Sequence, residues 1–208
     1  MTDPDLSNRP GFTIEPGIRP AHRARAIQYF WAAFGQKLRV PLGPEQKAVR
    51  FLDGAVDPAH AISAVSDEGE LLGVAGFKTE QGAFVGGGFS DLKAVYGTFG
   101  AIWRAVLLSL LERDKEPGEL LMDGIFVGEA ARGKGVGTAL LDAIVAEAQG
   151  RGLPAVRLDV IDTNPRARAL YERRGFEPVD EMQLGPLKSV FGFASATRMR
   201  LSVPGSPS

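Results

Sequence analysis

The sequence contains no cysteine among its 208 residues. This absence excludes disulfide bonds, thiolate metal sites and covalent catalysis by a cysteine. An excess of positive charge is also absent, because 24 Lys and Arg residues are balanced by 25 Asp and Glu residues and the formal net charge is −1. We therefore expect neither a nucleic acid nor an anionic membrane surface as a partner.

Long hydrophobic runs are missing as well. The most apolar segment, residues 91–113, is interrupted by Arg104 and is too short for a membrane span. The polar and acidic residues 1–11 lack the apolar centre of a signal peptide, so the default expectation is a cytoplasmic protein. We expect loose tails at about residues 1–10 and 204–208.

What is present fits an ordinary globular domain. The apolar fraction is 44% and the charged fraction is 24%, and the length suffices for one domain with a core of normal size. Helical spacing over residues 21–38 predicts a first helix, and a second helix is expected after Pro44. Residues 59–65 and 71–77 then predict a hairpin, which extends through 83–85.

A long helix is predicted for residues 91–113, because apolar residues recur there at helical spacing. The stripe consists of Val95, Phe99, Ile102, Trp103, Val106, Leu107, Leu110 and Leu111. Soluble monomers seldom expose an apolar patch of this size. We therefore expect the stripe to be buried in the protein's own core or to form an interface with a second copy, that is, a homodimer.

The last third of the chain alternates strands and helices, which predicts an α/β domain with a mixed sheet. Strands are expected at 120–127, 155–161, 176–183 and 193–203, and helices at 135–149 and 164–174. Asn164 is suited to cap the last helix, with Pro165 as its first residue. Gly175 is suited to end it in the left-handed conformation.

The segment RGKGVGTALL, residues 132–141, resembles an anion-binding loop, and three patterns compete for it. A P-loop requires a hydroxyl after its lysine, but Gly135 follows Lys134. A dinucleotide fingerprint, G-x-G-x-x-G, requires a third glycine where the sequence has Thr138 or Leu140. Neither of these two patterns is complete.

The third pattern, R-x-x-G-x-G, is complete from Arg132 to Gly137. Between a strand and a helix it directs consecutive backbone N–H groups and the positive end of the helix at a pyrophosphate. Its glycines allow the backbone to approach the phosphates closely. We therefore predict a pyrophosphate site here, although a plain glycine-rich turn is the alternative interpretation.

A second segment, NPRARALYERRGF at residues 164–176, follows the next predicted strand. With the R-x-x-G-x-G loop before it, the region from Leu120 to Phe176 resembles the GNAT superfamily of acyl-CoA-dependent N-acetyltransferases. The resemblance implies a single α/β (α+β) domain over residues 1–208, with a mixed, mostly antiparallel central sheet flanked by helices. The long helix 91–113 is then an insertion before the strand that leads to the pyrophosphate loop.

The resemblance also implies acetyl-CoA as the cosubstrate, with no metal, and assigns residues to it. Backbone groups of Ile125, Phe126 and Val127 are expected to hold the pantetheine, and Asn164 is assigned to the cofactor site as well. The pyrophosphate is expected at Arg132, Gly133, Lys134, Gly135, Val136, Gly137 and Thr138. Tyr171 matches the family's usual general acid, which protonates the departing thiolate; the alternative is an aromatic side chain that only packs beside the sheet.

An amine acceptor must lose a proton before it can attack, because an ammonium group with a pKa near ~10.4 has no free electron pair. Asp123 is the candidate base, since its even spacing from Ile125 and Val127 predicts that the three side chains share one face of a strand. An exposed strand-end aspartate is the equal alternative. His22 and His60 are expected to be peripheral surface or loop residues.

Without a cysteine, direct transfer in a ternary complex is favoured over an acyl-enzyme. The acceptor is expected to be a small-molecule or peptide amine, and the sequence does not choose between them. Aromatic residues near its expected site suggest an amphipathic acceptor, although core packing explains them equally well; they are Trp31, Phe34, Phe89, Tyr96 and Trp103. A non-catalytic module that binds acyl-CoA is the alternative function.

Overall fold

The computed structural model describes residues 8–9, 11–109 and 118–203. Within them the chain forms one mixed sheet in the order β1-β2-β3-β4-β6-β7-β9-β8, with β5 also paired to β4. The strands are β1 (Asn8–Arg9), β2 (Phe12–Pro16), β3 (Ala61–Ser66), β4 (Leu71–Thr79), β5 (Gly82–Ala83), β6 (Glu119–Val127), β7 (Ala155–Ile161), β8 (Glu177–Gln183) and β9 (Ser195–Ser202). The β6–β7 pair is parallel and the other pairs are antiparallel. The predicted mixed, mostly antiparallel sheet is thus confirmed.

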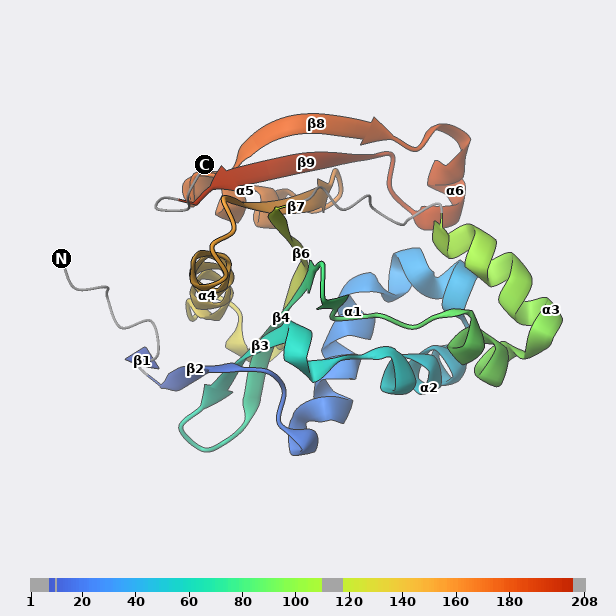
Figure 1. Cartoon of the computed structure of the whole chain (residues 1–208), viewed down its shortest axis with the longest axis horizontal. Coiled ribbons are helices and arrows are strands. Elements are labelled where there is room, and N and C mark those ends of the chain that lie inside the picture. The colour runs from blue at the N-terminus through green and yellow to red at the C-terminus, as the bar shows by residue number, and fades with distance from the viewer. Residues whose placement is uncertain (1–7, 10, 110–117, 204–208) are drawn as a thin grey trace.

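Helices cover both faces of this sheet (Figure 1). They are α1 (Arg23–Leu42), α2 (Glu45–Ala55), α3 (Phe89–Ser109), α4 (Val136–Gly150), α5 (Pro165–Arg173) and the single turn α6 (Lys188–Phe191). Short 3-10 turns lie at Pro20–His22, Pro58–His60, Glu129–Ala131 and Gly185–Leu187. Among the described helices, none is long and apolar enough to cross a membrane.

The sheet divides into two arms at β6 and β7. Their parallel pairing covers only three residue pairs and ends where Leu121 lies opposite Arg157. Beyond that point β6 stays paired to β4, and β7 stays paired to β9. The two arms diverge as Figure 1 shows, so one edge of β6 from Met122 onward has no strand beside it in the described sheet.

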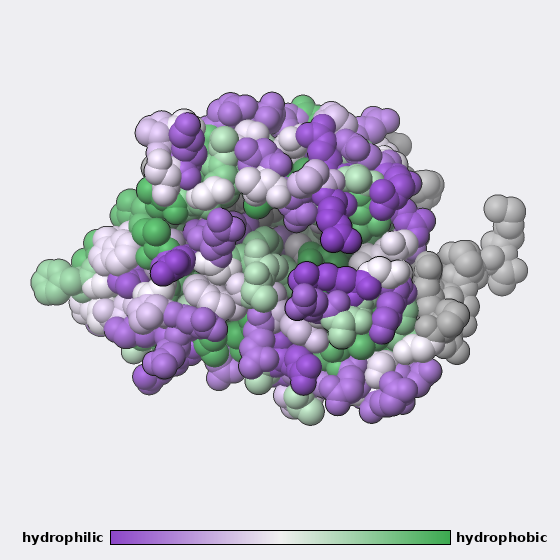
Figure 2. All heavy atoms as spheres, turned by 180° about the vertical axis from the view of Figure 1, so that it is seen from behind, coloured by the Kyte–Doolittle hydropathy of each residue, from purple (hydrophilic) through white to green (hydrophobic). Residues whose placement is uncertain are grey.

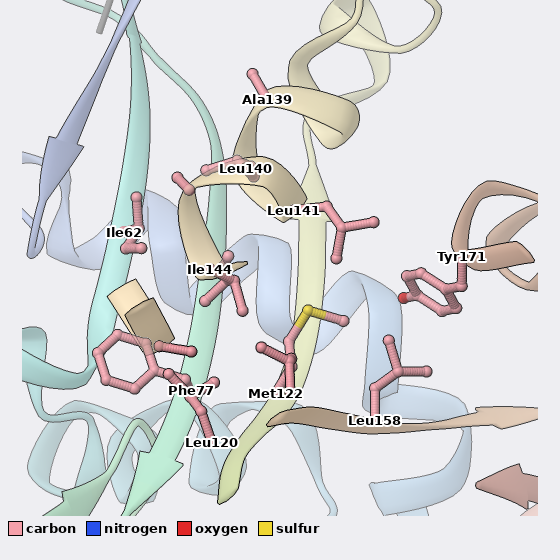
Figure 3. Close-up of a cluster of buried hydrophobic side chains, with 14 of the residues drawn as sticks. Ile62, Phe77, Leu120, Met122, Ala139, Leu140, Leu141, Ile144, Leu158 and Tyr171 are labelled. Carbon is pink, nitrogen blue, oxygen red and sulfur yellow. The ribbon is translucent and has the colours of Figure 1, made fainter. Parts of the chain in front are cut away.

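Two hydrophobic clusters hold the arms and helices together. One lies between α4 and the sheet and includes Leu140, Ile144, Met122 and Leu158 (Figure 3). The other lies on the opposite face, where α1 and α2 pack with Phe126 of β6. Burial of apolar side chains on both faces of β4 and β6 fixes the position of β6, which carries several of the predicted site residues.

The long helix differs from its prediction. It begins at Phe89 and is described to Ser109, while 110–113 lie outside the described residues. Gly97 interrupts it with a left-handed backbone (φ 72°, ψ 172°), so the helix consists of two segments rather than one. A break shifts the phase of the apolar stripe, and only Leu92 and Ala101 are buried. Burial of a continuous stripe in the protein's own core, the first of the two predicted alternatives, is therefore wrong, whereas an interface with a second copy stays a prediction.

The remaining differences are small. The third strand of the predicted hairpin is only Gly82–Ala83, and Val85 instead forms an isolated bridge with Val56. In contrast, the α5 region follows its local signals closely. The Asn164 side chain accepts a hydrogen bond from the N–H of Ala167, and Gly175 has φ 83°, as its position after the helix predicts.

Candidate active site

The gap between the two arms contains a cavity of about 280 Å³. Of the predicted site residues, Asp123, Ile125, Phe126, Asn164 and Tyr171 line this cavity. They come from β6, from the start of α5 and from its second turn, which are brought together because α5 packs beside β7. The sequence therefore identified residues from two separated motifs that meet in one space.

Tyr171 projects from α5 toward β6, and its hydroxyl faces that strand (Figure 3). The side chain is 7% exposed and its ring lies 6.0 Å from the ring of Phe176, centroid to centroid. Leu141 of α4 and Met122 of β6 border it on the cluster side. The ring is thus packed as a core residue, while the residue also lines the cavity; both interpretations made from the sequence describe part of its environment.

Asp123 differs from its predicted orientation because β6 has a bulge there. Gly76 of β4 pairs with Gly124, but the next residue, Phe77, pairs with Met122, which leaves Asp123 as the extra residue. A bulge interrupts the alternation of side chains and redirects the extra one. Ile125 packs on the α4 side with Met122, whereas Asp123 lies beside Phe34 and Lys37 of α1.

The predicted common face of Asp123, Ile125 and Val127 is therefore wrong for Asp123. The even spacing holds only without an inserted residue, and the bulge depends on how β6 pairs with β4. In the structure Asp123 lines the cavity together with Phe34 and Lys37 of α1. Asp123 is half-buried there rather than exposed at a strand end.

The glycine loop follows β6 after one 3-10 turn and leads into α4. Gly133 and Gly135 have φ values of 78° and 83°, a conformation that favours glycine. Gly135 is the N-cap of α4 and provides no side-chain cap, so the first N–H groups of this 15-residue helix are open to an anion. Arg132 and Lys134 are exposed beside them, with Arg132 Nε donating to Val127 O at 3.4 Å.

Other loop residues fill structural roles. Val136 is buried under the sheet, and Gly137 and Thr138 are half-buried in the first turn of α4. A Cβ on Gly137 would lie 3.7 Å from Val127 Cγ2, an ordinary contact. Val127 therefore connects the end of β6 to the loop, although neither Val127 nor the loop lines the cavity that contains Tyr171.

The two histidines were expected to be surface or loop residues; both lie in short 3-10 turns, but they are buried rather than on the surface. His22 is 9% exposed and its Nε2 lies 2.9 Å from Gly69 O. His60 is 8% exposed, and its Nδ1 lies 2.8 Å from a carboxylate oxygen of Asp57. The backbone N–H of Ala59 and then His60 hold the pKa of Asp57 below its ordinary value. Neither histidine lines the cavity, so their contacts are structural.

A second cavity of about 370 Å³ lies on the other side of Asp123, among α1, α2, α3, β4 and β6. Phe34, Lys37 and Asp123 line both cavities. The sequence analysis did not single out Lys37 or Lys78, which also lines the second cavity. The available signal for Lys37 was its position three residues after Phe34, on the same face of the first predicted helix.

Charged side chains also occur at the outer part of the first cavity. Arg198 of β9 lies 3.9 Å from Asp159 and 3.9 Å from Asp180, and all three line the cavity. Among the described residues, no group of three or more potential ligands is placed to hold a metal ion. The site is thus a polar cavity beside an open strand edge, followed by an uncapped helix N-terminus.

Comparison with known proteins identifies this arrangement. Residues 24–176 match the model of the Acetyltransferase (GNAT) family. A mycothiol acetyltransferase of Beutenbergia cavernae is 44% identical over 66 residues, which cover 32% of this chain. The match spans only 22% of that relative's length.

Solved structures show the same fold at low sequence identity. An N-acetyltransferase from Staphylococcus aureus Mu50 superimposes with a TM-score of 0.63 at 15% identity, covering 91% of this chain and all of that one (100%). A GCN5-related N-acetyltransferase from Kribbella flavida gives a TM-score of 0.60 at 16% identity, covering 92% and 98% of the two chains.

Proposed function

Because the chain belongs to the GNAT acetyltransferase family, we propose that it transfers an acetyl group from acetyl-CoA to a primary amine, directly in a ternary complex. The observation that carries this proposal is the cavity between β6 and β7, which Tyr171 and Asp123 line from different elements. Acetyl-CoA supplies an activated thioester and a pyrophosphate group through which the protein can bind it. The remaining chemistry belongs to the side chains and backbone of this chain.

The residues present fit acetyl-CoA. The α4 N-terminus has no side-chain cap and its preceding glycines adopt positive φ values, a combination that suits a pyrophosphate. The edge of β6 beyond Leu121 faces the gap rather than a neighbouring strand, so its backbone groups can pair with the amides of a pantetheine arm. We assign this role to Ile125 and Val127. The prediction is corrected for Phe126, because backbone groups alternate between the two edges of a strand and the N–H of Gly128, two residues later, donates to Leu72 O, which turns the groups of Phe126 toward β4.

Two side chains are assigned to proton transfer. Asp123 accepts a proton from the acceptor ammonium, directly or through water, so that the free amine nitrogen can attack the thioester carbonyl carbon. A new C–N bond forms and the C–S bond breaks. Tyr171 gives its phenolic proton to the departing sulfur and regains one from water, while the nitrogen of the new amide loses its second proton to water. A backbone N–H at the open edge of β6, near Phe126, donates to the oxyanion.

Calorimetry with coenzyme A tests the binding part of this proposal. Gly135→Val forces a left-handed position to accept a β-branched side chain, and we expect an affinity loss of about 10- to 100-fold, the equivalent of one charge-assisted hydrogen bond. Gly150→Val is the matched control, since Gly150 ends the same helix and nothing lies within 4 Å of a Cβ placed there. Failure of the parent protein to bind any acyl-CoA would overturn the proposal.

A thiol-release assay tests the catalytic part. We expect free coenzyme A to appear faster with a competent amine than without one, together with the acetylated amine. Binding of acetyl-CoA without amine-dependent thiol release across a broad amine library would instead identify a non-catalytic acyl-CoA-binding module.

A further inference from the structure

The second cavity is adjacent to the first and shares part of its wall. Phe34 and Lys37 of α1 and Asp123 of β6 line both spaces. The Phe34 ring packs edge-on against Phe126 at 5.2 Å, and Lys37 Nζ lies 3.8 Å from the centre of the Phe34 ring. Asp123 therefore lies where a group in the second cavity would meet a thioester held in the first. The rear view of the molecule shows a hollow near its middle (Figure 2).

The lining of the second cavity is mostly hydrocarbon. Twelve of its 18 lining residues have apolar side chains, and three, Lys37, Lys78 and Asp123, are charged. Phe30, Phe51 and Leu52 form its buried base. Phe89 and Leu108 of α3 close the side away from the sheet. Its volume of about 370 Å³ is near the lower end of the range for small-molecule sites.

We propose that this cavity holds the acceptor, and that the acceptor is a monoamine with an aromatic or aliphatic body. The inference rests on the proposed function and adds the substrate class. The apolar body occupies the space between α1, α2 and α3, while the amine reaches Asp123. A polyamine would leave additional ammonium groups against hydrocarbon walls, and burial of an unpaired charge is strongly unfavourable.

The two lysines add a second reason. Lys37 and Lys78 line the same cavity, and positive charge in its wall disfavours a further positive charge on a bound amine, which favours the neutral amine that can attack. Asp123 then takes the proton at the junction of the cavities. Of the five aromatic residues that suggested an amphipathic acceptor from the sequence, Phe34 and Phe89 line this cavity, whereas Trp31, Tyr96 and Trp103 do not.

A homologous amine series tests the substrate class. With saturating acetyl-CoA, kcat/KM should rise from benzylamine to 2-phenylethylamine to 3-phenylpropylamine by about fourfold per methylene, the equivalent of ~0.8 kcal/mol each. Spermidine should be at least about tenfold poorer than 3-phenylpropylamine, because its extra ammonium groups lack partners in an apolar site. Equal or better transfer to spermidine, or no rise along the series, would overturn the substrate class.

Variants of α3 test the location. Ala105→Phe adds a ring to the cavity wall and should lower kcat/KM for 3-phenylpropylamine by about tenfold or more, the loss expected when an apolar group is excluded. Ala94→Phe is the matched control, because Ala94 lies on the exposed side of the same helix and does not line the cavity. Leu108→Ala enlarges the cavity and should shift the preference toward longer amines. Equal effects of Ala105→Phe and Ala94→Phe would overturn the location.

The test of the acceptor cavity can fail independently of the test of the proposed acetyltransferase function. Calorimetry with coenzyme A reports only on the cofactor side, and saturation-transfer NMR with 3-phenylpropylamine reports only on the acceptor side. Coenzyme A binding and transfer to polar amines, without binding of 3-phenylpropylamine, would overturn the acceptor inference and leave the acetyltransferase proposal standing. Absence of coenzyme A binding would overturn the acetyltransferase proposal and, with it, the role of the cavity as an acceptor site.

Discussion

Helices α4 and α3 are both rich in apolar residues but use them differently. In α4, seven of 15 residues are buried, because the helix packs against β3, β4 and β6. In α3, only Leu92 and Ala101 are buried in 21 residues, and the helix packs against α1 and α2. The side of the molecule that we propose for the cofactor is thus built on the sheet, whereas the side that we propose for the acceptor is built largely on other helices.

The outer face of α3 consequently shows apolar side chains to solvent. Phe99 is 88% exposed, and Ile102, Trp103 and Val106 are between 41% and 59% exposed. In the rear view an apolar side chain projects at the end of the molecule that α3 forms (Figure 2). The apolar residues of α4 stabilise the fold. Helix α3, in contrast, carries more apolar side chains than its contacts with α1 and α2 bury.

The largest expected effect tests the side of the molecule proposed for the cofactor, which consists of β6, α4 and α5. Tyr171→Phe keeps the ring that packs against Phe176 and removes the one transferable proton. General acid catalysis contributes about 10²–10⁴-fold, and we expect a fall in kcat near the lower end of this range, because a thiol is a fair leaving group. Steady-state rates across pH with a competent amine provide the measurement.

The pH profile distinguishes catalysis from packing. The deficit of the Phe variant should shrink at high pH, where the thiolate leaves without a proton. Acetyl-CoA affinity should stay within about twofold, since the pyrophosphate loop is unchanged. A kcat equal to that of the parent at neutral pH, when chemistry limits the rate, would remove Tyr171 from the mechanism and leave it a core residue like its α4 neighbours.

The region of β6, α4 and α5 was predictable because its sequence signals are local. Asn164 caps a helix through an interaction within three residues, and Gly135 and Gly175 occupy positions defined by the backbone of one turn. Such features depend on the nearest neighbours in sequence. The order of strand, loop, helix and strand from Leu120 to Phe176 was therefore readable, and with it the meeting of Tyr171 and Ile125.

The acceptor side was less predictable because its features depend on distant partners. The bulge at Asp123 exists only in the register with Gly76 and Phe77 of β4. The break at Gly97 could be suspected from a glycine within an apolar stripe, but its effect on the stripe depends on where α1 and α2 lie. The burial of His60 likewise requires Asp57 and the close approach of Gly82, where a Cβ would lie 2.4 Å from the ring.

The second prediction concerns the junction between the two sides. Asp123→Asn preserves the size of the side chain and removes the proton acceptor. We expect kcat/KM at neutral pH to fall by about 10²-fold or less, since water can take the proton at a half-buried site. The loss should diminish above the pKa of the acceptor amine, where the neutral amine is already abundant.

Asp180→Asn is a suitable control for Asp123→Asn. Asp180 lines the same cavity at its outer part, beside Arg198, and lies on the exposed strand β8. Matching losses in the two variants would indicate a general electrostatic effect of the cavity and would argue against Asp123 as the base.

The third prediction tests whether the exposed face of α3 is an interface between copies, the alternative that remains for the apolar stripe. We expect the parent to form a dimer at micromolar concentration and Phe99→Glu to weaken it by at least about tenfold, as truncation of an interface aromatic typically does. Stability of the single chain should change by no more than about 0.5 kcal/mol, because Phe99 is exposed. Light scattering gives the mass.

Lys93→Glu is the matched control, since it changes the charge of α3 at an exposed polar position without removing apolar area. A parent protein that remains monomeric would contradict the dimer prediction. The exposed residues of α3 would then need another explanation than contact with a second copy.

The smallest expected effect concerns the polar contacts that attach α3. The Tyr96 hydroxyl donates a hydrogen bond to Leu42 O, at the end of α1, and Arg104 Nη2 donates to Gly43 O at 3.3 Å. Burial raises the pKa of Tyr96 above its ordinary 10.0, while the neighbouring Arg104 guanidinium opposes the shift. Lys47 Nζ also lies near the ring, 5.8 Å from its centre.

A raised pKa determines the sign of the pH dependence. The folded protein disfavours the phenolate more than the unfolded chain does, so the contribution of Tyr96 is fully present below about pH 10 and is lost as pH rises through the folded-state pKa. We expect the parent to exceed Tyr96→Phe in free energy of unfolding by ~1 kcal/mol at pH 8, the worth of one hydrogen bond. The difference should narrow above about pH 10.

Urea denaturation of both proteins at pH 8 and in steps above pH 10 measures this difference. Other pH-dependent changes occur in both proteins and largely cancel from the comparison, so the remaining change reports on Tyr96. A difference that stays constant with pH would show that the pKa of Tyr96 is the same in the folded and the unfolded protein, which would contradict the effect of burial on this phenol. The hydrogen bonds of Tyr96 and Arg104 to the end of α1 would then attach α3 equally at every pH, and no polar contact would give α3 a pH dependence that α4 lacks.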